Sequence, residues 1–208
     1  MNFPNILTRE EELRELLGQP SALVQNKVVD HLDTHIRDFL AKSPFVLIST
    51  ADAEGCCDVS PRGDQPGFVT VLNDNRLLIP ERPGNKRADT LRNILATGQI
   101  GLLFLIPGLE ETLRVNGRAC IVQDEELLKG LEANGKAPLL AIGVEVEEAF
   151  VHCAKALKRS KLWQPDTWLP SEELPVPARI LAAHVNLPDV NEQKITAALQ
   201  DSYTNRLY

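Results

Sequence analysis

The chain has 208 residues, of which 43% are hydrophobic and 25% charged, and its formal net charge is −7. This length and composition are typical of a globular protein with one substantial core and terminal appendages. The acidic balance argues against nucleic acid and against an anionic membrane as partners. No run approaches the roughly 18 apolar residues of a membrane span, and residues 1–12 do not resemble a signal peptide, so we expect a cytoplasmic protein.

The cysteines and histidines predict no metal site. The four cysteines follow neither a disulfide framework nor a paired metal knuckle, and we expect small buried thiols at Cys56, Cys57, Cys120 and Cys153. His31 and His35 lie four apart on an expected helix, but no third ligand accompanies them. His152 and Cys153 are neighbours whose side chains would diverge on a helix, which argues against a catalytic dyad.

Two helices are expected before the first strand. Residues 8–11, Thr-Arg-Glu-Glu, read as a capping box that opens a helix to about Leu17, with Gly18 ending it. Apolar residues recur at helical spacing over residues 28–41, and Pro44 ends this second helix.

The pattern then becomes typical of strands separated by turns. We expect strands over residues 45–50, 56–60, 68–72, 76–80, 100–106, 111–122 and 139–146, with 68–72 and 76–80 forming a hairpin. Helices are expected over 88–97, 124–134 and 152–161, and two short ones over 178–183 and 190–200. About six strands joined mostly by turns favour an antiparallel barrel decorated by helices.

The most informative segment for function is residues 79–91, where a strand ends, a Pro-Gly loop follows, and a helix opens at two adjacent cations. Unpaired N–H groups at a helix start, together with Arg82, Lys86 and Arg87, would suit a phosphate. The alternative is a solvated helix start whose cations pair with Glu81 and Asp89.

Three further segments carry polar groups with more than one reading. Residues 58–67 could hydrogen-bond a ligand, or form an ordinary loop with an Arg62–Asp64 pair. Arg114, Asn116 and Arg118 share one face of an expected strand, which suits an exposed sheet face, a ligand contact or a subunit interface. Residues 158–163 combine cations with a tryptophan, which could cover a flat anionic ligand or pack a helix end onto the core.

These segments in this order resemble the pyridoxamine 5′-phosphate oxidase-like superfamily of FMN-binding split barrels. The runs that carry the resemblance are 60–64 (SPRGD), 80–87 (PERPGNKR), 101–104 (GLLF), 113–117 (LRVNG) and 159–163 (RSKLW), and it covers about residues 45–163. It implies a mainly β fold with helices (α+β), namely a six-stranded antiparallel split β-barrel with N- and C-terminal helices. It also implies a homodimer with FMN in a cleft between the subunits.

The resemblance further implies which residues bind the cofactor. The phosphate would be held at Asn85, Lys86 and Arg87, and the flavin ring would lie along Ile79, Pro80 and Glu81. The earlier polar loop contributes Ser60, Arg62, Asp64 and Gln65, and Arg62 is the candidate for tuning the flavin. The partner subunit would supply contacts from a later strand and the C-terminal region, with Arg114, Asn116, Arg118, Arg159 and Trp163 as candidates.

The sequence departs from the true oxidase in ways that leave the substrate open. The oxidase has an arginine-rich strand ending in lysine before its phosphate loop, whereas this chain has residues 60–65 there. Residues 186–208 also lack the oxidase pattern of residues that bind the substrate phosphate. We therefore expect an FMN-dependent oxidoreductase that acts on a small-molecule substrate or electron donor, without an assigned catalytic side chain. The alternatives are a non-catalytic flavin carrier and a related barrel that binds haem or a deazaflavin.

The expected organisation has three parts. Residues 1–43 form an N-terminal helical segment packing on the barrel, 44–163 the FMN-binding split-barrel domain, and 164–208 a C-terminal helical tail.

Overall fold

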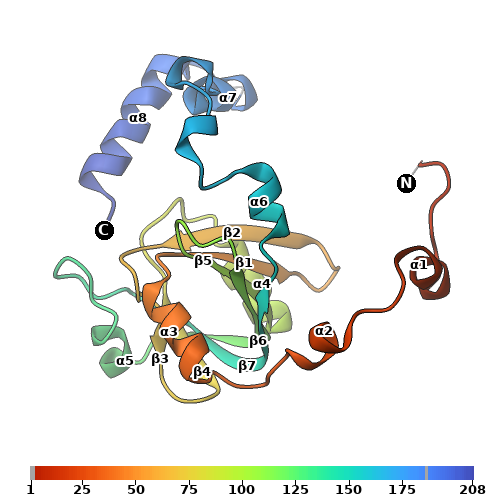
Figure 1. Cartoon of the computed structure of the whole chain (residues 1–208). Helices are drawn as coiled ribbons and strands as arrows, with labels where there is room; N and C mark the ends of the chain where they lie inside the picture. Colours follow the sequence, from red (N-terminus) through yellow and green to blue (C-terminus); the bar gives the residue numbers. More distant parts are fainter. Residues whose placement is uncertain (1–2, 186) are drawn as a thin grey trace.

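One strongly curved antiparallel sheet organises the protein (Figure 1). The computed structural model describes residues 3–185 and 187–208. Within them seven strands follow the order β2-β1-β5-β6-β7-β4-β3. Their bounds are β1 (Phe45–Ala51), β2 (Cys57–Gly63), β3 (Thr70–Val71), β4 (Arg76–Pro80), β5 (Gln99–Leu105), β6 (Thr112–Val122) and β7 (Ala141–His152). The predicted α+β split barrel is thereby confirmed.

The sheet has seven strands, one in each of the seven segments expected from the sequence, whereas the family resemblance implied six. The shortest is β3, whose two residues pair with β4, Thr70 opposite Leu78 and Val71 opposite Leu77. The turn at residues 73–75 joins these strands as the expected hairpin, because the Asn73 side chain accepts a hydrogen bond from the Asn75 amide at 2.9 Å.

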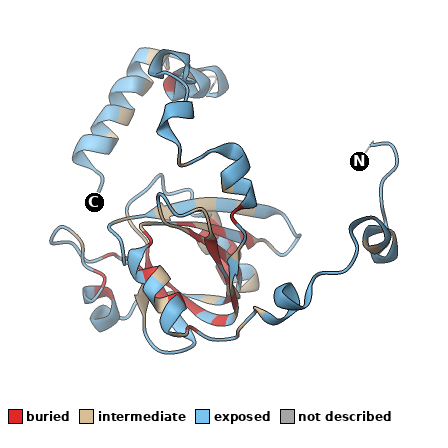
Figure 2. Cartoon of the chain, viewed as in Figure 1, coloured by how far each residue is buried: buried red, intermediate tan, exposed pale blue. Residues whose placement is uncertain are grey.

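The core lies inside the curve of the sheet, where buried residues line the strands (Figure 2). Alternation along each strand explains this, since Val46 and Ile48 of β1 and Leu102 and Phe104 of β5 point to the same face. Residues of the segment before β1 close the core, with Leu32, Ile36 and Leu40 buried against it. Burying a side chain of this kind contributes about 1.5–3 kcal/mol to stability.

The longest strand pair, β6 with β7, corrects a predicted boundary. Pairing continues from Val122 opposite Ala141 to Thr112 opposite His152, so β7 extends six residues beyond its predicted end at Val146. The predicted helix over 152–161 is correspondingly short. A β-bulge at Asn116/Gly117 bends the pair, and a Cβ on Gly117 would lie 2.0 Å from the Glu145 carbonyl oxygen. Only glycine fits this close backbone approach.

The number of helices is close to the number expected from the sequence, but several helix boundaries differ. They are α1 (Glu10–Leu17), α2 (Ala22–Asn26), α3 (Thr34–Lys42), α4 (Asp89–Thr97), α5 (Glu125–Lys129), α6 (Lys155–Ser160), α7 (Pro177–His184) and α8 (Glu192–Asn205). Helix α2 was not predicted, and α5 is shorter than expected. Helix α3 starts six residues later than expected, because Val29 instead forms a bridge with Ala149 of β7. His31 therefore lies outside the helix that carries His35.

The two terminal segments project from the barrel on different sides (Figure 1). Helices α1 and α2 contain no buried residue, and α7 and α8 contain only Ala178. The N-terminal helix starts at Glu10 with Arg9 as its cap, so the predicted capping box does not form, while Gly18 ends it as expected with φ 73°. No helix among the described residues is both long enough and apolar enough to span a membrane.

Candidate functional site

The inner face of β2 is polar where the inner faces of its neighbours are apolar. Antiparallel partners share a face, so Ser60 and Arg62 lie on the same side as the core residues Ile48 and Val46. Strand β2 is an edge strand, and this leaves both polar side chains only partly buried. Here the sheet is open, and polar groups face the inside of the barrel.

Two ion pairs connect this edge to the end of β4. Arg62 donates Nε to Glu81 Oε2 at 2.8 Å and Nη2 to Oε1 at 3.2 Å. Arg82 donates Nε to Asp64 Oδ2 at 2.7 Å. The side chains of Arg62 and Glu81 are only 17% and 23% exposed, which makes this pair less screened than a surface pair. The alternative of an Arg62–Asp64 pair is wrong, because each residue pairs across the opening instead.

Helix α4 contacts strands β1 and β2 through hydrogen bonds from Asn93. The Asn93 amide donates to Thr50 Oγ1 at 3.1 Å and to Asp58 Oδ2 at 2.9 Å. Thr50 and Asp58 are paired residues of β1 and β2. This buried asparagine thereby fixes α4, and with it the loop that precedes α4, relative to the inner face of β2.

Tyr208 joins the site from far along the chain. Its hydroxyl donates to Asp64 Oδ1 at 2.7 Å, its ring lies 6.0 Å from the Arg82 guanidinium, and its carbonyl oxygen accepts from Lys136 Nζ at 2.9 Å. The Asp64 carboxylate, together with burial, raises the pKa of Tyr208. Burial alone would raise the pKa of Asp64, but hydrogen bonds from Tyr208, the Gln65 amide and Arg82 outweigh it and lower the pKa. No local sequence pattern indicates this contact.

The predicted phosphate-binding residues lie together on the exposed loop between β4 and α4. Asn85 Oδ1 accepts a hydrogen bond from the Arg87 amide at 3.0 Å, and the Arg87 guanidinium pairs with Asp89. Lys86 has no ion-pair partner among the described residues. The alternative of a solvated helix start, with its cations paired to Glu81 and Asp89, is thus correct in part. Arg87 does pair with Asp89, but Glu81 pairs with Arg62 instead.

The backbone of this loop suits an anion as well. Lys86 and Ala88 both have φ 60°, which turns the chain sharply into α4. Within the described part of the chain, the backbone amides of Thr90 and Leu91 donate to no acceptor, as expected for the first turn of a helix. Lysine and arginine side chains beside free amides form a donor set that fits a phosphate group.

The remaining residues predicted near β2 and β4 are close to this loop in the fold. Ile79 and Pro80 are the buried last residues of β4, and the Glu81 amide donates to the Leu140 carbonyl at 3.1 Å. Gln65 is exposed, and its backbone amide donates a hydrogen bond to Asp64 Oδ1 at 2.8 Å.

Five other predicted residues lie elsewhere. Arg114 donates to Asn116 at 3.2 Å, and Asn116 donates to Glu148 at 2.5 Å. Arg114 and Arg118 are exposed on the outer face of β6. Exposed Arg159 lies on α6, and Trp163 donates its indole N–H to the Leu109 carbonyl at 2.8 Å. Within one chain, none of these five forms a hydrogen bond with Arg62, Glu81 or residues 83–88 among the described residues.

A separate hollow of about 300 Å³ lies on the outer face of β4, β6 and β7, beside α5. Of the predicted site residues it contains only Arg118. Its lining is mainly apolar, and its residues are Leu72, Arg76, Leu77, Leu78, Arg118, Ala119, Cys120, Val122, Leu127, Gly143, Val144 and Glu145.

The cysteines contradict the expectation of buried thiols. All four are free and exposed, because Cys57 and Cys120 point to the outer face of the sheet while Cys56 and Cys153 flank strands. Three or more potential metal ligands do not cluster anywhere in the part of the chain that the structure describes. His31 contacts Asp30 at 2.9 Å.

Comparisons with solved structures find barrels of low similarity. HupZ from Group A Streptococcus is 18% identical over 57% of this chain and 92% of its own, with a TM-score of 0.47. General Stress Protein 26 from Bacillus anthracis is 13% identical over 57% and 94%, with a TM-score of 0.42. HutZ, the heme storage protein from Vibrio cholerae, is 16% identical over 58% and 93%, with a TM-score of 0.39. Similarities of this size do not bear on function.

The family assignment rests on a different comparison. A search of curated proteins finds no match to the chain. The model of the pyridoxamine 5′-phosphate oxidase family matches residues 32–153, which is more than half of the chain. The match runs from the first core residue before α3 to the end of β7, and so includes every strand and the loop between β4 and α4. The chain therefore belongs to the pyridoxamine 5′-phosphate oxidase family.

Proposed function

We propose that this protein binds FMN and acts as an FMN-dependent oxidoreductase on a small-molecule substrate. Asn85, Lys86 and Arg87 would hold the phosphate. The end of β4 and the inner face of β2 would hold the flavin ring. A second copy of the chain would complete the site with residues from β6 and from the segment that follows β7.

This proposal rests on two ion pairs that span the opening of the barrel. Arg62–Glu81 and Arg82–Asp64 hold the end of β4 against the edge of β2. The basic loop at residues 85–87 follows directly. A polar inner face thus lies near a basic loop in the fold, which supports a ligand with a polar ring system and a phosphate.

Bound FMN would supply hydride or electron transfer, and the protein would supply binding, orientation and electrostatics. Lys86 would contribute a point charge to the phosphate. Arg87 would have to share its guanidinium between the phosphate and Asp89. The charge of Arg62 is largely balanced by Glu81. Arg62 would therefore influence how easily the flavin ring is reduced mainly through its N–H groups.

Comparing FMN with riboflavin tests the phosphate site, because the two ligands share the ring and differ in the phosphate. The Lys86→Ala/Arg87→Ala double variant should weaken FMN binding by about tenfold to a hundredfold per lost charge-assisted hydrogen bond. Riboflavin affinity should stay unchanged. Arg92→Ala, which removes an exposed cation one turn into α4, is the matched control. Equal FMN affinity in the double variant and the wild type would refute the assignment.

Two simpler measurements separate the alternatives. A flavin absorption spectrum of the purified protein supports FMN, whereas a Soret band indicates haem, and a deazaflavin has its own distinct single band. Steady-state turnover with NADH or NADPH supports an oxidoreductase. Reduction of the bound flavin without turnover indicates a carrier.

A further inference from the structure

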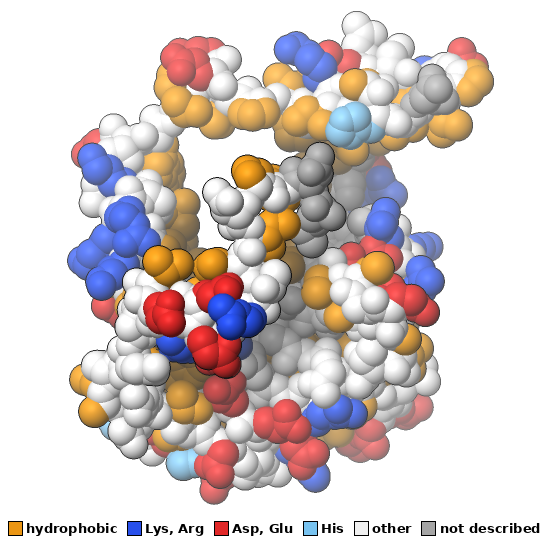
Figure 3. Space-filling model, turned by 90° about the vertical axis from the view of Figure 1, so that its right-hand side faces the viewer, with side chains coloured by type: hydrophobic (Ala, Val, Ile, Leu, Met, Phe, Trp, Pro, Cys, Tyr) orange, Lys and Arg blue, Asp and Glu red, His pale blue; other side chains and the backbone are white. Residues whose placement is uncertain are grey.

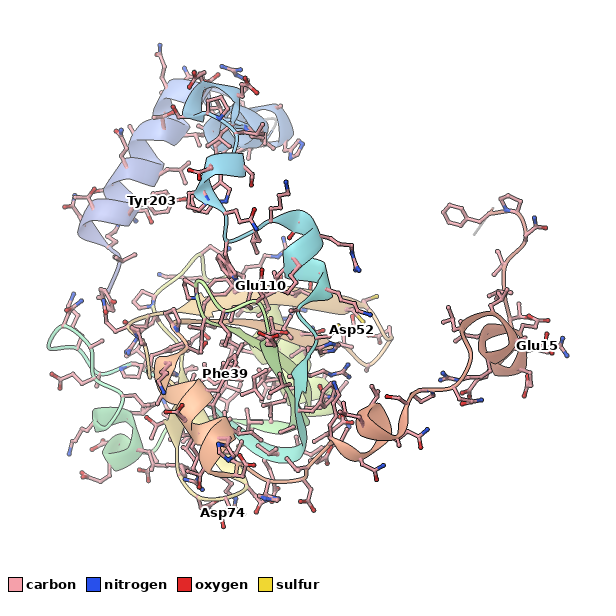
Figure 4. All side chains as sticks on the ribbon, viewed as in Figure 1. Glu15, Phe39, Asp52, Asp74, Glu110 and Tyr203 are labelled. Atoms are coloured by element: carbon pink, nitrogen blue, oxygen red, sulfur yellow. The ribbon has the colours of Figure 1, made fainter. Side chains whose placement is uncertain are left out.

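The N-terminal arm, residues 3–26, contains no buried residue and carries several exposed apolar side chains. Leu16 and Leu17 of α1 are 72% and 73% exposed, and Leu13, Leu23 and Val24 are exposed as well. Figure 4 shows Glu15 on α1 far from the barrel. Among the described residues, the arm is joined to the barrel just after its end, through the hydrogen bond from Lys27 Nζ to the Val151 carbonyl at 2.8 Å and the bridge between Val29 and Ala149.

Helices this short need packing to persist. Helix α1 has eight residues and α2 has five, and isolated helices below about 12–15 residues are marginal in water. The chain also exposes 14420 Å², whereas a compact monomer of 23.0 kDa exposes about 9,600 Å². The excess of about 4,800 Å² is more than one chain contributes to a large obligate dimer interface.

Charges on the arm complement those of the basic segment, which we define as residues 155–169. In α1, Arg9 pairs with Glu12 and Arg14 with Glu10, which leaves Glu11 and Glu15 without an ion-pair partner among the described residues. In the basic segment Lys158 pairs with Glu110. The cations left without such a partner in the described chain are Lys155, Arg159 and Lys161.

The basic segment also has an apolar part. Leu162, Trp168 and Leu169 are exposed, Trp168 by 59%. Beyond the basic segment, Figure 3 shows further hydrophobic side chains along the underside of the C-terminal helical tail, at the top of that view. In Figure 1 the arm and the basic segment of the same chain lie apart. The arm thus has acidic groups beside exposed leucines, the basic segment has cations beside exposed leucines, and these leucines stay exposed in the described part of the chain.

We propose that α1 of one chain packs on the basic segment of a second copy, and that the second chain returns the same contact. This inference rests on the homodimer of the proposed function and names the surfaces that would hold it together. Twofold symmetry forms both contacts at once. Because Arg159 and Trp163 belong to the basic segment, the arm would also fix the position of two candidate flavin contacts.

Cross-linking in a mixture of isotopically light and heavy chains tests this directly. A zero-length carbodiimide reagent should join Glu11 or Glu15 to Lys155 or Lys161 in light–heavy peptide pairs. Cross-links found only in light–light and heavy–heavy pairs would mean contact within one chain and would overturn the proposal.

Variants test the energetic role of the arm. Leu16→Asp/Leu17→Asp should raise the dimer dissociation constant at least about tenfold, since it removes two leucines from an interface. Leu139→Asp is the matched control, because Leu139 is 86% exposed and lies outside both surfaces. Glu11→Lys/Glu15→Lys should weaken the dimer, and Lys155→Glu/Lys161→Glu in the same chain should restore it. A dissociation constant that none of these changes alters would overturn the proposal.

These outcomes are separate from those of the flavin proposal. A dimer that binds FMN but has no arm cross-links refutes the arm contact and leaves the proposed function intact. Mixed-isotope cross-links in a dimer without FMN binding support the arm contact and refute the flavin. A monomer at all concentrations overturns the arm contact, whatever it binds.

Discussion

The ion pair between Arg62 and Glu81, which spans the opening of the barrel, is expected to stabilise the protein measurably. We consider the substitutions Arg62→Met and Glu81→Gln, alone and together. The pair has two hydrogen bonds, at 2.8 and 3.2 Å, and both side chains are less than one quarter exposed. A hydrogen bond to a charged group contributes about 1.5–3 kcal/mol, and desolvation of both charges offsets part of this. We therefore expect a coupling energy of about 1–2 kcal/mol.

Urea unfolding of the four proteins measures this coupling as a difference in the free energy of unfolding. The same cycle on Arg179 and Glu192 is the internal control, because that pair also has two hydrogen bonds, at 3.2 and 3.4 Å, but is mostly exposed. A surface pair should give about 0.5 kcal/mol or less. If Arg62 and Glu81 couple no more strongly than the control pair, the argument that burial strengthens this contact is wrong.

Three further predictions concern single positions. Gly117→Ala should destabilise the protein by about 3 kcal/mol or more, measured by urea unfolding, because the added methyl would collide with the Glu145 carbonyl; Gly84→Ala, with open space around it, should be nearly neutral. Tyr208→Phe should cost about 1 kcal/mol, since it removes the donor to Asp64, whereas Tyr203→Phe on exposed α8 should cost almost nothing, and equal losses in the two variants would contradict this. The pKa of Asp64 is lowered in the fold, so its contribution to stability is present above the unfolded value of about 3.9 and lost as pH falls through the folded pKa. Acid titration of unfolding should therefore show the advantage of wild type over Asp64→Asn shrinking at low pH, and a constant difference would refute the shift.

Local patterns predicted most of the barrel because each depends only on neighbouring residues. Alternation of apolar residues identified the strands, and turn residues such as those at 73–75 identified the hairpin. The start of α4 after a Pro-Gly loop was predicted for the same reason, since a helix start depends on the residues around it.

Features that depend on pairing could not be predicted in this way. The end of β7 was placed six residues early because its last residues are held by β6 and not by their own propensity. The start of α3 was placed early because the bridge from Val29 to Ala149 competes with helix formation. Partners for these contacts lie dozens of residues away, and no spacing rule identifies them.

The sequence by itself determined the order of the strands along the chain, the basic pair at Lys86 and Arg87 and the family. Tertiary structure alone decided that Arg62 pairs with Glu81 rather than with Asp64, which lies two residues away. It also brought Tyr208 to Asp64 across 144 residues. The physical reason is that sheet register and loop closure choose the partner of a charged side chain, and both are properties of the whole fold.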